Sequence, residues 1–114
     1  MGLKLPDKHL KAGAAIRTRL QHLGLYRPSG HEHFRGSLTF AIPAADGSGM
    51  VVDVYGRKIL DGHLRKGTAY HTNLTDKKAG VFNVGAFASA GEVVLCASMF
   101  DSLTLWSNGY RNTT

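Results

Sequence analysis

The chain has a single cysteine, Cys96, among its 114 residues. One cysteine cannot form an internal disulfide, and it cannot supply the several thiolates of a cysteine-rich zinc site. Because Cys96 ends the apolar run that begins at Val93, we interpret it as a small core residue on a strand and not as a reactive nucleophile.

Long hydrophobic runs are also missing. No stretch approaches the roughly 18 apolar residues that a membrane-spanning helix needs, and residues 1–13 contain no apolar signal region. We therefore expect a cytoplasmic protein that does not enter a membrane.

Acidic residues are scarce. Eight Asp and Glu stand against fourteen Lys and Arg, so the formal net charge is +6. An excess of this size favours a polyanion such as nucleic acid as the partner, although many basic domains bind none. The composition, 43% hydrophobic and 19% charged, is that of a folded domain and not of a disordered tail.

The periodicity of apolar residues predicts an α+β fold. A helix is expected from Asp7, its N-cap, to Gly24, and residues 36–42 and 50–57 alternate as two strands of a hairpin around the turn at 44–49. The remaining expected elements are a short strand at 68–74, a short helix at 86–90, a buried strand at 93–96, a helix at 101–107 and the start of a strand at 110–114. Together they predict an N-terminal helix, a small antiparallel sheet and a partial βαβ element.

Basic residues gather in loops after the predicted strands. Gly56 would let the backbone approach a ligand, and Arg57 after it can bind phosphate through two N–H groups. Grooves for single-stranded nucleic acid combine such charges with aromatic rings on which bases stack, although solvated surface loops give the same sequence pattern. The candidate nucleic-acid-binding residues are Arg57, Lys58, Arg65, Lys66, Tyr70, Lys77 and Lys78.

Two further patterns could hold a metal. His31 and His33 could face one way on an extended chain, but a third ligand at a recognisable spacing is missing, and a polar loop is the alternative. Asp101 is either the N-cap of the last helix or one carboxylate of a divalent-metal site. A single carboxylate binds magnesium poorly.

Several segments, taken in order, resemble the polymerase domain of DnaG-type primases, and most closely the primase-like proteins of phages and mobile elements. They are LQHLGL at 20–25, GHEHFRGSL at 30–38, the hairpin at 41–57 that ends in Gly-Arg, the basic stretch at 78–83, and residues 92–112, which resemble the first motif of a TOPRIM fold. The resemblance implies one domain over 1–114, with the N-terminal part of a polymerase domain at 20–90 running into an incomplete TOPRIM unit at 91–114.

The resemblance also implies roles for single residues. Arg57 would belong to the basic groove that holds template or incoming nucleotide. Tyr70 and Lys78 match less closely, because the preceding loop differs in length and Ala69 stands where the family has a lysine.

A catalytic residue of that family is replaced here. TOPRIM domains carry a glutamate four residues before the aspartate that matches Asp101, and Ala97 occupies this position. The second acidic motif has no counterpart before Thr114. Because two-metal phosphoryl transfer needs several carboxylates, we expect no catalytic residue beyond the remnant Asp101, and no cofactor, with Mg²⁺ only where a fuller acidic site is supplied elsewhere.

The leading hypothesis is a non-catalytic, primase-derived protein that binds single-stranded DNA or RNA. The alternative is a small phage or mobile-element interaction module that inhibits or recruits a larger nucleic-acid-processing complex, with its basic face on an acidic protein surface. A third reading is a fragment of a full-length primase whose other parts restore the site.

Overall fold

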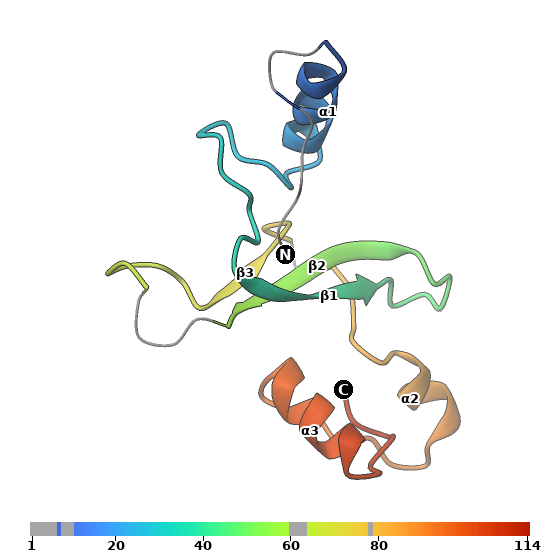
Figure 1. Ribbon diagram of the computed structural model, residues 1–114. Helices are drawn as coiled ribbons and strands as arrows, with labels where there is room; N and C mark the ends of the chain where they lie inside the picture. The colour runs from blue at the N-terminus through green and yellow to red at the C-terminus, as the bar shows by residue number, and fades with distance from the viewer. Residues whose placement is uncertain (1–6, 8–10, 60–63, 78) are drawn as a thin grey trace. The chain divides into compact units, whose positions relative to one another are not determined.

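The computed structural model describes residues 7, 11–59, 64–77 and 79–114. These residues form three helices and one three-stranded sheet, and the expected α+β fold is confirmed (Figure 1). None of the helices is long and apolar enough to cross a membrane. In chain order the elements are α1 (Lys11–His22), β1 (Ser37–Pro43), β2 (Val51–Lys58), β3 (His71–Asn73), α2 (Gly85–Ser89) and α3 (Met99–Ser107).

The sheet has the strand order β1-β2-β3. The hairpin of β1 and β2 forms as expected, and β3 pairs antiparallel with β2, with Tyr55 opposite Asn73 and Arg57 opposite His71. The third strand is shorter than the predicted 68–74 and covers only three residues.

Two compact units make up the chain. Unit 1 consists of Met1–Phe40 and Val54–Lys77, and unit 2 of Ala41–Asp53 and Lys78–Thr114. Their limits follow internal packing, whereas the expected division into 20–90 and 91–114 follows the family resemblance and stays a prediction.

In unit 1, α1 ends where its glycine predicts. Gly24 has a φ of +76°, a conformation that costs glycine little. Its N–H donates to the carbonyl of Gln21 and the N–H of Leu25 donates to that of Leu20, both at 3.0 Å. This bond pair is the Schellman motif, which satisfies carbonyls that the helix leaves open. The predicted start of the helix falls on residues 8–10, outside the described residues.

The core of unit 1 centres on Phe34, whose side chain is completely buried. Gly56 on β2 faces this ring, and a Cβ added there would stand 2.4 Å from Phe34 Cδ1. The expectation that Gly56 makes room for a ligand is therefore wrong, because a side chain of the protein itself fills that room. The space left by its missing side chain holds the phenyl ring.

The core of unit 2 contains Ile42 from β1 and Ala86 from α2, which are 7% and 2% exposed. Gly80 forms an antiparallel bridge with Ala44. A Cβ at Gly80 would stand 2.5 Å from both Ile42 Cγ2 and the carbonyl oxygen of Pro43. The backbone at residue 80 therefore lies directly against β1.

The segments before and after α3 meet at one isolated bridge. Val94 and Thr113 form a parallel bridge on either side of the helix, in which the N–H of Val94 donates to Asn112 and that of Thr114 donates to Val94. The buried strand predicted at 93–96 is wrong, because Val94 and Leu95 are 41% and 77% exposed.

Two related expectations change with that strand. Cys96 is half-buried and not a core residue, and the strand expected at 110–114 pairs at a single bridge. The reason is that, among the described residues, only one backbone segment pairs with 93–96, so no sheet face covers it. Apolar character alone does not bury a strand without such a cover.

Candidate nucleic-acid interface

Several predicted site residues meet at one end of the sheet. Arg57 and Lys58 are the last residues of β2, and Arg57 lies opposite His71 on β3. The backbone N–H of Lys58 donates to the carbonyl of Tyr70 at 2.9 Å. Arg57 is exposed and the ring of Tyr70 is 49% exposed, so the structure places a guanidinium and an accessible aromatic ring on neighbouring segments.

The loop before β3 adds two more cations. Arg65 and Lys66 are exposed, and the N–H of Thr68 donates to the carbonyl of Arg65 at 3.0 Å, which closes a turn. Gly67, next in the chain, has a φ of +85°. The turn therefore carries both cations directly before Gly67 and Thr68, which line a pocket together with Lys58.

Lys77 does not join this group. It follows the other end of β3, where the N–H of Leu74 donates to Val54 and the chain runs away from Arg57. The hydroxyl of Thr75 donates to the carbonyl of Lys77 at 2.7 Å in an exposed bend. Lys78 lies outside the described residues.

Tyr55 interacts with both His71 and Arg57. Its hydroxyl shares a hydrogen bond with Nδ1 of His71. Burial raises the pKa of the Tyr55 phenol above its ordinary value, and the positive charge of Arg57 acts in the opposite direction. Arg57 thus acts electrostatically on a residue two positions earlier on the same strand.

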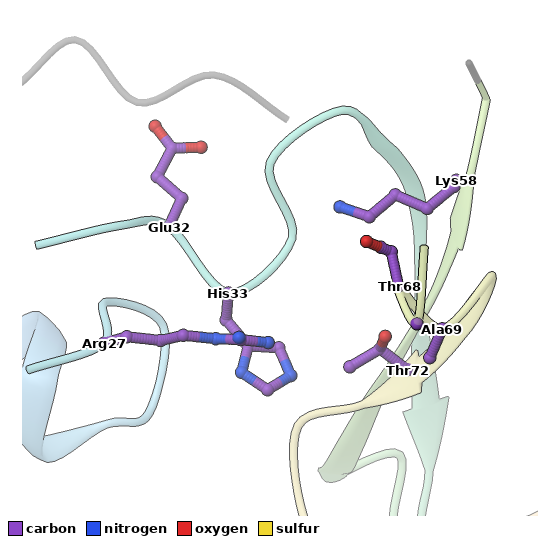
Figure 2. Close-up of a pocket in the computed structure, with 8 residues that line it drawn as sticks. Arg27, Glu32, His33, Lys58, Thr68, Ala69 and Thr72 are labelled. Atoms are coloured by element: carbon purple, nitrogen blue, oxygen red, sulfur yellow. The ribbon is translucent and has the colours of Figure 1, made fainter. Parts of the chain in front are cut away.

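Beside these residues lies a polar pocket of about 420 Å³. Figure 2 shows Arg27, Glu32 and His33 on one side and Lys58, Thr68 and Thr72 on the other, with the Glu32 side chain pointing away from those of Arg27 and His33. Of the six predicted site residues that the structure describes, only Lys58 lines it.

Two of the lining side chains are held by backbone carbonyls. His33 donates from Nε2 to the carbonyl of Asn73 at 2.9 Å, and its ring packs edge-on against Phe34 with the centroids 4.7 Å apart. The ammonium of Lys58 donates to the carbonyl of Arg35. His33 and Lys58 are therefore positioned by the main chain.

Sequence reasoning missed most of this pocket. Arg27 stands in a turn-rich stretch, and nothing in its neighbourhood distinguishes it from a surface arginine. Thr68 and Thr72 have no motif of their own. The only local signal was the pair of histidines at 31 and 33, interpreted as a metal site or a polar loop.

The structure separates those two histidines. His31 is exposed, while His33 bonds to Asn73. Within the described residues, no three His, Cys, Asp or Glu side chains are grouped so that they could hold a metal ion.

Asp101 has a structural partner. Ser98, and not Asp101, is the N-cap of α3: its hydroxyl oxygen accepts the N–H of Asp101 at 3.2 Å and donates to the Asp101 carboxylate at 2.8 Å. The N-cap interpretation of Asp101 is therefore corrected: Asp101 is the third residue of the helix, and both its N–H and its carboxylate bond to the hydroxyl of the Ser98 cap. Ala97, immediately before the cap, is exposed.

Comparison with known proteins places the fold. No protein-family model matches the sequence, and no curated protein matches it either. Among solved structures, the chain is similar to the crystal structure of the Aquifex aeolicus primase, zinc-binding and RNA polymerase domains, with a TM-score of 0.65 and 21% sequence identity. The match covers 96% of this chain and 30% of that chain, so this chain spans less than a third of the length of the primase structure. The fold of this chain is therefore primase-like.

Proposed function

We propose that this chain binds single-stranded nucleic acid through the end of the sheet formed by Arg57, Lys58, Arg65, Lys66 and Tyr70, named here the basic end. The observation that supports it most directly is the meeting of these residues from two strands and the loop between them, beside a polar pocket. The net charge of +6 and the primase-like fold favour the same partner.

The proposal excludes polymerase chemistry by this chain. Ala97 brings no carboxylate, and the carboxylate of Asp101 accepts a hydrogen bond from the Ser98 hydroxyl at the start of α3. We interpret residues 91–114 as a TOPRIM-derived element that lacks its glutamate, related to the primase-like proteins of phages and mobile elements. The proposed protein acts in the cytoplasm and needs no cofactor of its own.

Salt dependence gives the proposal a quantitative form. Each phosphate contact with a single strand contributes about −0.7 to the slope of log K against log salt. Three exposed cations, Arg57, Arg65 and Lys66, give a slope near −2 by that rule. Affinity should then fall about 20-fold between 50 and 200 mM salt.

Fluorescence anisotropy with a labelled single-stranded oligonucleotide, repeated across a salt series, tests this. The double variant Arg57→Ala/Arg65→Ala is expected to make the slope shallower, from about −2 to about −0.7, because two phosphate contacts are lost. The matched control Lys11→Ala/Arg19→Ala removes the same charge from exposed positions on α1 and should keep the slope. Equal losses in both variants would mean that only net charge drives binding, and the proposed site would be wrong.

A second candidate function has an observation of its own. Leu95 is 77% exposed beside Val94 at 41%, on a segment whose bridge in the described residues joins only Thr113. Segments of this kind invite pairing with another chain. An interaction module that recruits or inhibits a larger nucleic-acid-processing complex would use this edge, and Leu95→Asp should then abolish capture of that complex without changing oligonucleotide binding.

A further inference from the structure

The pocket beside the basic end differs from a surface that follows a nucleic-acid backbone. It is hollow, and its lining comes from the turn at 27–33, the end of β2 and the segment at 67–72. The turn is held by hydrogen bonds from Arg27 N–H to the carbonyl of His31 and from Gly30 N–H to that of Arg27, at 2.8 and 2.9 Å. Tyr26 and Glu32 bridge its base. The pocket is thus built by separate segments of unit 1.

Its donors outnumber those that a backbone phosphate needs. Arg27 and Lys58 supply cations and Thr68 and Thr72 supply hydroxyls. With one hydrogen bond made to Arg35, the Lys58 ammonium keeps two further N–H groups. A phosphodiester carries one charge on two free oxygens, whereas a phosphate monoester carries about −1.5 to −2 on three acceptor oxygens. The donor set matches the monoester better.

The acidic residue Glu32 in the lining disfavours a small inorganic anion as the ligand. Glu32 is among the lining residues, so the formal charges of Arg27, Lys58 and Glu32 sum to a single positive charge. The volume of about 420 Å³ lies within the range of small-ligand pockets.

The pocket adjoins the surface cations directly. Arg57 precedes Lys58, and Arg65 and Lys66 precede Gly67 in the turn at its rim. A strand held by these exposed cations would have its end beside the pocket. We propose that the pocket binds the phosphate monoester at the end of a nucleic-acid strand, with Arg27 and Lys58 on the phosphate. This inference rests on the proposed function, because the strand must be held at the basic end.

The test compares oligonucleotides of one sequence with an internal label and three kinds of end: unphosphorylated, 5′-phosphate and 3′-phosphate. One of the two phosphorylated oligonucleotides is expected to bind about tenfold more tightly than the unphosphorylated one. A single charge-assisted hydrogen bond contributes enough free energy for a difference of this size. Arg27→Gln and Thr72→Val should each lower this ratio toward one, while Arg19→Gln keeps it. Circular dichroism confirms that each variant is folded.

The outcomes separate the two proposals. The affinity for the unphosphorylated strand tests the basic end. The ratio of the affinities for phosphorylated and unphosphorylated strands tests the pocket. A ratio near one in the wild-type protein would overturn the pocket assignment even if every strand binds well. The protein could instead bind a free nucleoside monophosphate, with an affinity that Arg27→Gln lowers, while phosphorylated and unphosphorylated strands bind equally well. That result would show that the pocket takes a free nucleotide, and the strand end would be ruled out as its ligand. Binding no tighter than that of the Arg57→Ala/Arg65→Ala variant, for every end, would overturn both.

Discussion

Replacing Gly56 by alanine tests how unit 1 is packed. Alanine normally stabilises a strand relative to glycine, since it restricts the unfolded chain, and a compatible change of this kind contributes about 0.4–1 kcal/mol. At Gly56 the new methyl group would stand 2.4 and 2.8 Å from two carbons of the Phe34 ring. Carbon atoms in contact prefer separations of about 3.5–4.0 Å, so the ring must move by about 1 Å.

Phe34 has little freedom to move. Its side chain is completely buried, and the neighbouring His33 ring packs against it edge-on. Overpacking a well-filled core costs about 1–3 kcal/mol. After the gain from the unfolded state is subtracted, Gly56→Ala should lower the free energy of unfolding by about 1–2 kcal/mol. The corresponding drop in Tm is about 5–10 °C for a chain of this size.

Urea denaturation followed by circular dichroism measures the change, with two controls. Gly91→Ala adds the same methyl group where nothing lies within 4 Å and should be neutral or mildly stabilising. Phe34→Leu removes the ring, so Gly56→Ala should cost less in that background, with a coupling of about 0.5–3 kcal/mol. If Gly56→Ala stabilises the protein as Gly91→Ala does, or costs the same with leucine at position 34, the packing argument is refuted.

Two further predictions concern α3 and the basic end. Ser98→Ala should lower the free energy of unfolding by about 1 kcal/mol, because it removes the hydroxyl that caps the N–H of Asp101. The control Ser89→Ala removes only a hydrogen bond to a carbonyl within α2 and should cost less. A cost for Ser98→Ala no larger than that control would contradict the cap. Arg57→Ala should raise the pKa of Tyr55 further above its ordinary value of 10.0, because burial remains and the opposing positive charge is lost. Tyrosinate absorbance against pH measures this, Tyr55→Phe identifies the signal, and an unchanged midpoint would show that the guanidinium does not act on the phenol.

The elements that the sequence predicted well are those with local causes. Gly24 ends α1 because a left-handed residue is needed there, and the turn at 44–49 joins β1 to β2 through Asp46, which accepts the N–H of Ser48 at 2.9 Å. Both signals lie within a few residues of the feature that they specify. A single sequence contains that information directly.

The predictions that failed depend on distant parts of the chain. The apolar residues Val94 and Leu95 resemble a buried strand, but burial depends on what covers a strand, and the described residues provide one bridge to Thr113. Gly56 behaves similarly: its role follows from Phe34, 22 positions earlier in the sequence. Local composition shows neither whether another segment covers residues 93–96 nor which side chain packs against Gly56.

The candidate site also has one part with local causes and one part that depends on distant residues. The exposed cations at the basic end lie at the end of β2 or in the turn at 65–68, and both charge and position near a strand end or turn can be recognised from the sequence. The pocket requires Arg27 to come close to Lys58 and Thr72, residues 31 and 45 positions later, and that approach depends on the pairing of β2 with β3 and on the bond from His33 to Asn73. Charge patterns can therefore indicate that a chain binds a polyanion. The chemical form of that anion is set by donors that only tertiary structure assembles, and for this reason the end-group experiment tests the structure more sharply than binding alone does.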